Sequence, residues 1–190
     1  MVQEARIEKT EDGDVVVSDG WFVMHVSEAP WMRSERFGKG CRFEGRTRFP
    51  QVAINLRVLE PGKPACLYHR ENAQEDFLVL SGECILLVEE QERRLRAGDF
   101  VHCPANATHV FVGAPDQQAV VLMIGYRPET EEICYPVSEI AAGYGASVEV
   151  ETTDVAEAYG PRKIEPIASQ WPLPGFEGGQ PRPASERSDG

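Results

Sequence analysis

Hydrophobic and polar residues alternate most clearly between residues 52 and 59. Val52, Ile54, Leu56 and Val58 alternate with Ala53, Asn55, Arg57 and Leu59. A period of two indicates a β-strand with two distinct faces. Shorter extended segments follow at 66–71, 75–81, 84–88, 93–96, 100–103, 109–112 and 119–126, with Gly, Pro or charged turn residues between most of them. This spacing predicts an all-β barrel or sandwich and argues against an α/β sheet.

The pattern before residue 52 is less regular. Residues 15–17 and 21–26 are strand-like and are separated by the turn pair Asp19-Gly20, which predicts an N-terminal hairpin. Such a hairpin can close a sheet edge or pair with a second subunit. Residues 27–45 show no period and contain several Gly and Pro residues, so we expect a long irregular segment that covers the barrel.

The C-terminal third shows no strand pattern and instead predicts short helices and a Pro-rich tail. We expect a short helix within 137–144 that begins after Ser138, and a second helix capped by Asp154 that ends at Gly160-Pro161. The tail beyond is rich in Pro and Gly. Its large apolar residues Ile164, Ile167, Trp171 and Phe176 predict that part of it lies on the barrel, and we expect the last dozen residues to be disordered.

These patterns suggest three regions within one domain-sized chain of 190 residues. Residues 1–45 hold the N-terminal strands and the cover, residues 46–127 form the barrel core, and residues 128–190 form a C-terminal helical and Pro-rich extension.

Composition narrows the class of partner. The formal net charge is −12, which argues against nucleic acid or an anionic membrane surface, because both require a concentrated positive patch. The sequence begins without an apolar leader, and its apolar runs are too short for a spanning helix. Five scattered cysteines without C-x-x-C spacing favour free thiols in a reducing compartment. We therefore expect a cytoplasmic protein that acts on a small molecule.

One group of residues has the chemistry of a metal site. His69 and Glu71 are two residues apart, so on a strand they project from the same face. Glu75 can reach the same point if the chain turns at residues 72–74, and His109 would arrive from a distant strand. Imidazole nitrogens with carboxylate oxygens suit Fe(II), Mn(II), Zn(II), Co(II) or Ni(II). Each of these residues could instead be a hydrogen-bonded core histidine or a solvated carboxylate.

The spacing of this group resembles that of the cupin superfamily. The first motif of that family is present as Gly62, His69-Arg70-Glu71, Glu75 and Gly82. The second is present as Gly98, Pro104-Ala105-Asn106, His109 and Gly113. The resemblance covers residues 62–113 and extends through the flanking strands to about 50–126.

The resemblance implies a double-stranded β-barrel of the jelly-roll type. It also implies a homodimer through the N-terminal strands, because barrels of this family commonly expose an edge there. It implies that His69, Glu75 and His109 are metal ligands, with Glu71 in the place of a second histidine. Glu71 is the main departure from the motif, and we expect it to be a fourth ligand. Asn106 stands where the motif has a glycine, and Asn tolerates the positive φ that this turn requires.

The function implied is that of a mononuclear metalloenzyme. We expect an oxygenase of the dioxygenase type, with Fe(II) or Mn(II) favoured over Zn(II), Ni(II) or Co(II), acting on a small organic substrate. A sugar isomerase or epimerase and a non-catalytic binding barrel are the alternatives, because one fold hosts many functions. Tyr68, Arg57 and Tyr126 could contact a substrate if they face inward. His102, on the strand before Pro104, could line the barrel or point outward, and we expect His25 to be structural.

Overall fold

The computed structural model describes residues 1–178, which form fourteen strands and two short helices. The strands are β1 (Ile7–Thr10), β2 (Gly13–Val16), β3 (Trp31–Ser34), β4 (Gly38–Arg42), β5 (Val52–Leu59), β6 (Arg70–Glu71), β7 (Glu75–Ser81), β8 (Glu83–Val88), β9 (Gln91–Arg96), β10 (Phe100–Cys103), β11 (His109–Gly113), β12 (Ala119–Tyr126), β13 (Ile133–Cys134) and β14 (Ile164–Ile167). The helices are α1 (Glu139–Ala142) and α2 (Val155–Tyr159).

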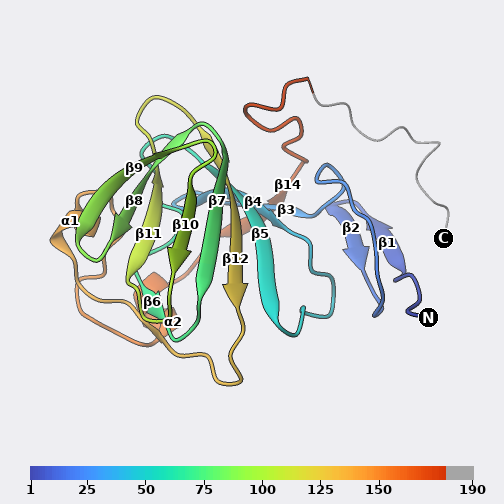
Figure 1. Cartoon of the computed structure of the whole chain (residues 1–190), viewed down its shortest axis with the longest axis horizontal. Helices are drawn as coiled ribbons and strands as arrows, with labels where there is room; N and C mark the ends of the chain where they lie inside the picture. Colours follow the sequence, from blue (N-terminus) through green and yellow to red (C-terminus); the bar gives the residue numbers. More distant parts are fainter. Residues whose placement is uncertain (179–190) are drawn as a thin grey trace.

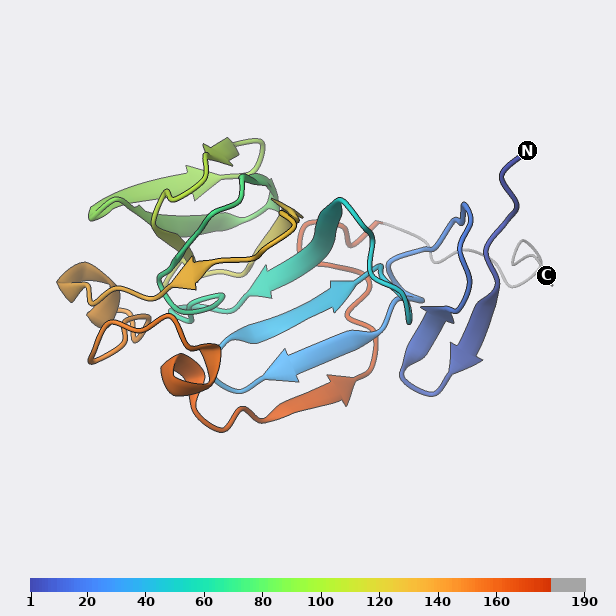
Figure 2. The same cartoon turned by 90° about the horizontal axis from the view of Figure 1, so that it is seen from below.

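Two antiparallel sheets face each other and enclose the main core. The larger sheet has the order β10-β7-β12-β5-β4-β3-β14, and the smaller has the order β11-β8-β9. Figures 1 and 2 show the two layers, with the short helices at one end of them. Phe77, Val79 and Val121 of the large sheet pack against Leu86 and Phe111 of the small one. The predicted all-β jelly-roll class with short C-terminal helices is confirmed.

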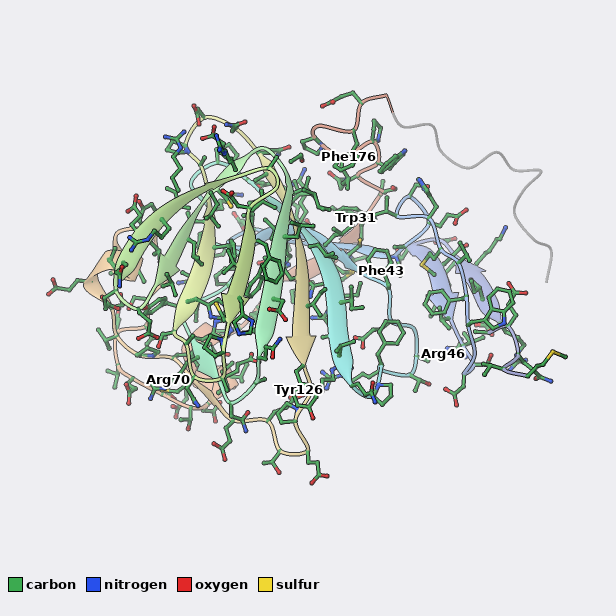
Figure 3. The ribbon with its side chains drawn as sticks, viewed as in Figure 1. Trp31, Phe43, Arg46, Arg70, Tyr126 and Phe176 are labelled. Atoms are coloured by element: carbon green, nitrogen blue, oxygen red, sulfur yellow. The ribbon has the colours of Figure 1, made fainter. Side chains whose placement is uncertain are left out.

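A second core lies on the outer face of the large sheet. Trp31, Val58 and Val120 are buried there, and the C-terminal segment covers them with Trp171 and Phe176. Figure 3 shows Trp31, Phe43 and Phe176 on this side of the molecule. The prediction that the tail lies on the barrel is confirmed, and the tail adds β14 to the sheet beside β3. The disorder expected for the last dozen residues concerns positions outside the described part.

The prediction of an irregular segment at residues 27–45 was wrong. This segment contains β3 and β4, and β4 pairs with β5, so the sheet crosses the boundary expected at residue 45. The glycines of β4 hide its period in the sequence, since they carry no side chain to alternate. Gly40 is required by packing: a Cβ there would lie 2.6 Å from the carbonyl oxygen of Leu56.

The N-terminal hairpin exists, and the strand predicted at 15–17 overlaps β2, but the strand predicted at 21–26 was wrong. β1 pairs with β2 through a turn at residues 11–12, with Ile7 opposite Val16. Trp21 forms only an isolated bridge with Glu4 and is 51% exposed. The polar residues at 11–12 therefore form the turn of the hairpin, and Asp19-Gly20 does not. A homodimer through this region stays a prediction.

Both predicted helix starts are confirmed. The Ser138 side chain accepts a hydrogen bond from the backbone N–H of Ala141, and Asp154 accepts from Ala156 and Glu157. These bonds satisfy N–H groups that have no partner within the helix. Among residues 1–178, no helix has the length and apolarity needed to span a membrane.

Candidate metal centre

A backbone bridge brings the two candidate histidines together. The N–H of His109 donates to the carbonyl of His69 at 2.9 Å, and the N–H of His69 donates to the carbonyl of His109 at 3.2 Å. Directly opposed residues of an antiparallel pair place their side chains on one face. The imidazole ring centroids are accordingly 5.2 Å apart. Residues forty positions apart thus meet because the strand at β11 lies against the segment that leads into β6.

Glu75 joins them from the first position of β7. It lies on the same face as Phe77, and the Phe77 ring centroid is 5.2 Å from that of His109. Oε2 of Glu75 is 3.3 Å from Nε2 of His109. One ligand atom from each of His69, Glu75 and His109 lies within 4.8 Å of the others. The structure therefore assembles three of the four predicted ligands around one point.

Hydrogen bonds at the far side of each imidazole fix which nitrogen faces this point. Nδ1 of His69 is 2.8 Å from the carbonyl oxygen of Leu67, and Nδ1 of His109 is 3.0 Å from that of Ala107. A carbonyl can only accept, so Nδ1 carries a proton in each ring and Nε2 is the nitrogen that faces the carboxylates. This arrangement orients metal-binding histidines in many proteins. With two imidazoles and a carboxylate, the donor set fits a divalent transition metal.

Glu71, the fourth predicted ligand, lies at the rim of the triad. Its Oε1 is 3.5 Å from Nε2 of His69, and its side chain is 34% exposed, against 17% for Glu75. It is not one of the three residues whose ligand atoms lie within 4.8 Å of one another. Direct coordination by Glu71 stays a prediction.

The protonation states of the two carboxylates differ because their surroundings differ. Burial raises the pKa of Glu75 to about 7, with an opposing effect from His69. The hydrogen bond with His69 lowers the pKa of Glu71 below its ordinary value, against the effect of burial. Without an ion, the site therefore holds one carboxylate that is ionised and one that binds a proton near neutral pH.

The histidines are also shifted in opposite directions. Burial, together with the charge of His69, lowers the pKa of His109 to about 4. Burial alone would lower the pKa of His69, but Cys66, Glu71 and Glu75 raise it well above its ordinary value. The electrostatics of the triad thus localise positive charge on His69, beside the carboxylates.

Three further side chains surround the triad, and their role could not be inferred from the motifs. Sγ of Cys66 lies 3.7 Å from Nδ1 of His69. The ring of Tyr135 is 5.9 Å from that of His69, and the ring of Tyr159 is 5.5 Å from that of Tyr135. The Tyr159 hydroxyl accepts a hydrogen bond from the N–H of Leu67 at 3.3 Å. The C-terminal extension therefore contributes directly to the walls of the site.

The other residues considered from the sequence are not part of the triad. Of the two orientations open for His102, the structure has the outward one: it projects from the outer face of β10, where its Nδ1 is 2.7 Å from Oδ1 of Asp76. Tyr68 is buried in a separate cluster with Leu87 and Val110.

His25 is also outside the site, as expected, because its Nδ1 is 2.7 Å from Oγ of Ser27 and its ring packs edge-on against Trp171. Tyr126 is 54% exposed at the end of β12, at the rim of the molecule where Figure 3 also places Arg70. Arg57 is the one residue of the possible substrate-contacting group Tyr68, Arg57 and Tyr126 that faces the barrel interior: it is paired with Val121, a residue of the main core.

The motif turn also has the expected backbone. Asn106 has φ +69°, the left-handed conformation for which asparagine is tolerated. Its N–H donates to the carbonyl of Glu71 at 2.7 Å, so the second motif supports the position of the first.

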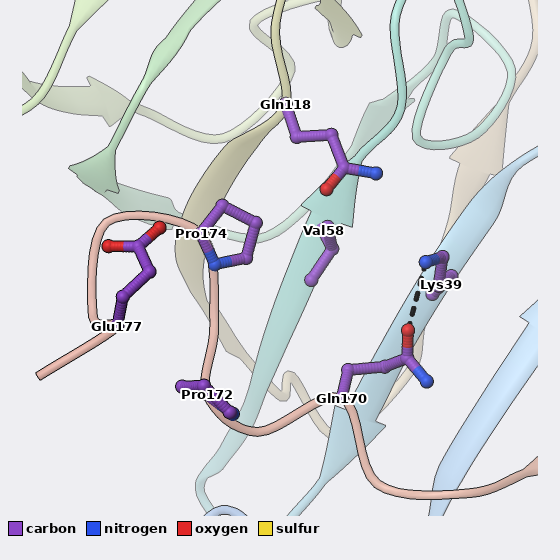
Figure 4. A pocket seen from close by; sticks show the side chains of 7 residues that line it. All are labelled: Lys39, Val58, Gln118, Gln170, Pro172, Pro174 and Glu177. Carbon is purple, nitrogen blue, oxygen red and sulfur yellow. Dashed lines mark hydrogen bonds between the residues drawn. The ribbon is translucent and has the colours of Figure 1, made fainter. Parts of the chain in front are cut away.

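Two surface cavities lie away from this centre. The one in Figure 4, of about 390 Å³, is lined by Val58, Gln170 and Pro174 among others, with Lys39 donating to Gln170. Val58 points to the opposite face of β5 from Arg57. The second, of about 430 Å³, lies beside residues 147–152. Neither cavity is lined by a residue of the triad.

Residues 55–125 match the family model of the cupin domain. This chain contains a cupin domain. The match includes both motifs and all three residues of the triad, so the predicted resemblance is confirmed.

Solved structures agree with the cupin fold. The chain is similar to a sugar phosphate isomerase of the cupin superfamily from Silicibacter pomeroyi, with 25% identity and a TM-score of 0.52, covering 59% of this chain and 80% of that one. A protein assigned as a sugar phosphate isomerase from Acidithiobacillus ferrooxidans is 32% identical, with a TM-score of 0.42 over 44% of this chain. The match spans 55% of that protein's length.

A polyketide cyclase from Streptomyces resistomycificus is 11% identical, with a TM-score of 0.45, covering 67% of this chain and 78% of that one. No curated protein matches the chain. The chemistry of this chain has to be argued from the site.

Proposed function

We propose that this protein is a metal-dependent isomerase or epimerase that moves a proton within a small polar substrate. His69, Glu75 and His109 would hold a divalent metal ion. The observation that carries the proposal is the position of Glu71, an ionised and partly exposed carboxylate 3.5 Å from a residue of the triad. A proton-transfer enzyme requires such a base beside its polarising group.

Each residue of the site has a defined role in this proposal. A bound cation would act as a Lewis acid on a carbonyl or hydroxyl oxygen of the substrate. Glu71 takes the proton from the neighbouring carbon, because a carboxylate is ionised at neutral pH and the exposure of Glu71 lets a substrate reach it. The aromatic rings of Tyr135 and Tyr159 exclude water from one side of the centre.

The similarity to the Silicibacter protein supports the same class of reaction. That protein is named a sugar phosphate isomerase, and the match covers 59% of this chain and 80% of that one. Sugar phosphates carry the hydroxyl and carbonyl groups that this chemistry needs, so they are the first substrates to test.

The test combines metal content with proton exchange. Protein purified without an affinity tag should contain a transition metal close to one ion per chain. In D₂O, the metal-loaded protein should incorporate deuterium at the carbon next to the carbonyl of phosphorylated aldoses or ketoses, as measured by NMR. Glu71→Gln should stop the exchange while retaining the metal, whereas the surface variant Glu131→Gln should behave as the parent. Metal-loaded protein without exchange on any of these substrates would contradict the proposal.

An Fe(II)-dependent oxygenase is the second candidate, and the ligand set favours it. Two histidines and one carboxylate with open positions are the ligands of many non-haem iron oxygenases. Consumption of O₂ with phenols or diketones, measured with an oxygen electrode, would support this candidate. A protein that binds metal but shows neither proton exchange nor O₂ consumption would fit the non-catalytic binding barrel.

A further inference from the structure

Arg57 occupies the inner face of the same sheet that carries Glu75. In β5, Arg57 lies opposite Val121 of β12 and Gly40 of β4, and Val121 belongs to the core between the sheets. Glu75 lies opposite Gly125, which in turn lies opposite Ala53 of β5. Ala53 and Arg57 are four residues apart, so they share this inner face.

Gly40 provides the space in which the Arg57 side chain lies. A Cβ on Gly40 would be 2.8 Å from Cδ and 3.3 Å from Nη1 of Arg57. The guanidinium therefore passes directly over the backbone of β4. The absence of a side chain at residue 40 is what allows this basic group to enter the barrel.

The charge of Arg57 has no anionic partner in the part of the chain that the structure describes. Its one hydrogen bond there is from Nη2 to the carbonyl oxygen of Ala65, at 3.0 Å. Arg42 lies two residues after Gly40 and so projects from the same face of β4. Burial lowers the pKa of Arg57, Cys66 and Tyr159 oppose this shift, and the positive charge of Arg42 adds to it. A buried charge without a counter-ion destabilises a folded protein, so such groups are normally paired.

The same protein shows the paired arrangement at a second arginine. Nη1 and Nη2 of Arg127 lie 2.7 and 3.0 Å from the two carboxylate oxygens of Glu44. Both side chains of this ion pair are largely buried. Arg57 has no such carboxylate, and most of its fork of N–H groups remains available for an oxyanion.

Arg57 is also connected to the metal centre through its neighbours. Arg57 donates to the carbonyl of Ala65, and the next residue, Cys66, has its Sγ 3.7 Å from Nδ1 of His69. From strand spacing of about 4.8 Å and a rise of about 3.4 Å per residue, the Cα atoms of Glu75 and Arg57 are on the order of 15 Å apart. The two side chains extend from the same face and shorten this gap to the size of a small metabolite.

We propose that Arg57, with Arg42 beside it, binds an oxyanion of the substrate while the other end of the substrate reaches the metal centre. The position of the anion site next to the triad rests on the proposed function, whereas the binding of an anion does not. The oxyanion is a phosphate or a carboxylate, since the planar fork of arginine matches both. The overall charge of −12 means that attraction has to be local, as these two arginines would provide.

The test is anion binding by the metal-free protein. Inorganic phosphate and succinate are titrated separately, and the melting temperature is compared with that in sodium chloride of the same ionic strength. At least one of the two should raise the melting temperature of the parent protein. Preference for phosphate would indicate a phosphorylated substrate, and preference for succinate a carboxylated one.

Arg57→Met decides whether this residue is responsible. The variant should lose the response to both anions, and without anions it should melt at the same or a higher temperature, because it removes an unpaired buried charge. The exposed Arg48→Met is the matched control and should keep the response. If Arg57→Met does not fold, Arg57→Lys keeps the charge but loses the fork, and its affinity should fall about tenfold. An unchanged response in the variants, or none in the parent protein, would overturn the inference.

His109→Ala separates this inference from the proposed function. The anion response should persist in this variant although the metal is lost. Anion binding by a parent protein that never binds metal would refute the proposed function and leave the anion site intact. Metal binding without an anion response would refute only the anion site.

Discussion

Nε2 of His109 lies 3.3 Å from Oε2 of Glu75, and this contact joins the two cupin motifs. His109 follows the turn of the second motif. Glu75 belongs to the first motif and is the first residue of β7. Because the His109 ring is neutral and its Nδ1 is bound to a carbonyl, the contact presents a lone pair and a carboxylate to the same point. This geometry leads to a direct prediction for metal binding.

His109→Ala should abolish metal binding and the stability that depends on it. A ligand that binds only the folded state at a thousand times its Kd adds about 4 kcal/mol, so the metal-loaded parent should lose several degrees of melting temperature with a chelator. His109→Ala should show no response to the chelator. His102→Ala is the matched control, because His102 is a half-exposed histidine on the outer face of the sheet. A chelator response retained by His109→Ala would contradict the assigned ligands.

Glu71→Gln and Glu75→Gln should have different effects. Glu75 lies in the triad and Glu71 at its rim, so Glu75→Gln should lose metal and Glu71→Gln should keep it. Removing a general base typically lowers kcat by about 10²–10⁴-fold, which is the effect expected for Glu71→Gln. Elemental analysis and the rate of deuterium incorporation measure the two effects on the same samples. Equal loss of metal in both variants would instead make Glu71 the fourth ligand.

The buried pair of Glu44 and Arg127 should make stability depend on acid pH. Burial raises the pKa of Glu44. The hydrogen bonds and the charge of Arg127 lower this pKa by more than burial raises it, so the net shift is downward. A carboxyl with a depressed folded pKa contributes stability above its unfolded pKa, near 4.5, and this contribution is lost as pH falls through the folded value. Denaturant unfolding between pH 7 and about pH 3 measures this loss.

Glu44→Gln tests the assignment of that pH dependence. The variant leaves Arg127 buried without its carboxylate, which should cost about 3 kcal/mol at pH 7. Its stability should then decline less steeply on acidification than that of the parent. Glu131→Gln, at an exposed pair with Arg48, should change neither quantity by more than about 0.5 kcal/mol. A parallel decline in parent and Glu44→Gln would assign the acid sensitivity to other groups.

The triad could be predicted because its residues lie in two short motifs with a defined spacing. Residue spacing in two short motifs implied His69, Glu75 and His109, and the turn at Asn106 has the φ that the motif implied. The surroundings of the triad could not be predicted in the same way. Which face of β5 points inward depends on its pairing with β4 and β12. The alternation within β5 alone therefore does not determine whether the Arg57 side chain points into the barrel or out of it.

Glycine explains why the strand β4 was not predicted from the sequence. β4 contains Gly38 and Gly40, and an alternation of glycines has no hydrophobic period to detect. The strand forms because its neighbours β3 and β5 supply the pairing and because Gly40 fits over Arg57. Likewise, the cap at Asp154 predicted α2, but nothing in that pattern indicated that Tyr159 would pack against Tyr135 and bind the N–H of Leu67, next to the metal centre.

The cap of α2 should therefore influence the site that Tyr159 lines. Oδ1 of Asp154 accepts hydrogen bonds from the N–H groups of Ala156 and Glu157, at 2.6 and 3.2 Å. α2 has five residues, none of them buried, so it depends on its cap more than a long packed helix would. Asp154→Ala should cost about 1 kcal/mol, chiefly by local fraying that releases Tyr159 from its contacts with Tyr135 and Leu67.

Hydrogen exchange distinguishes this local effect from general destabilisation. In Asp154→Ala, the N–H groups of Ala158 and Gly160 should exchange faster, because their helical bonds to Asp154 and Ala156 open more often. The N–H of Leu67, bonded to the Tyr159 hydroxyl, should also exchange faster, whereas amides of β8 should not change. Asp154→Asn keeps a capping oxygen and should restore protection at all three positions. Faster exchange in β8 as well as α2 would mean that the cap stabilises the whole domain and has no particular link to the site.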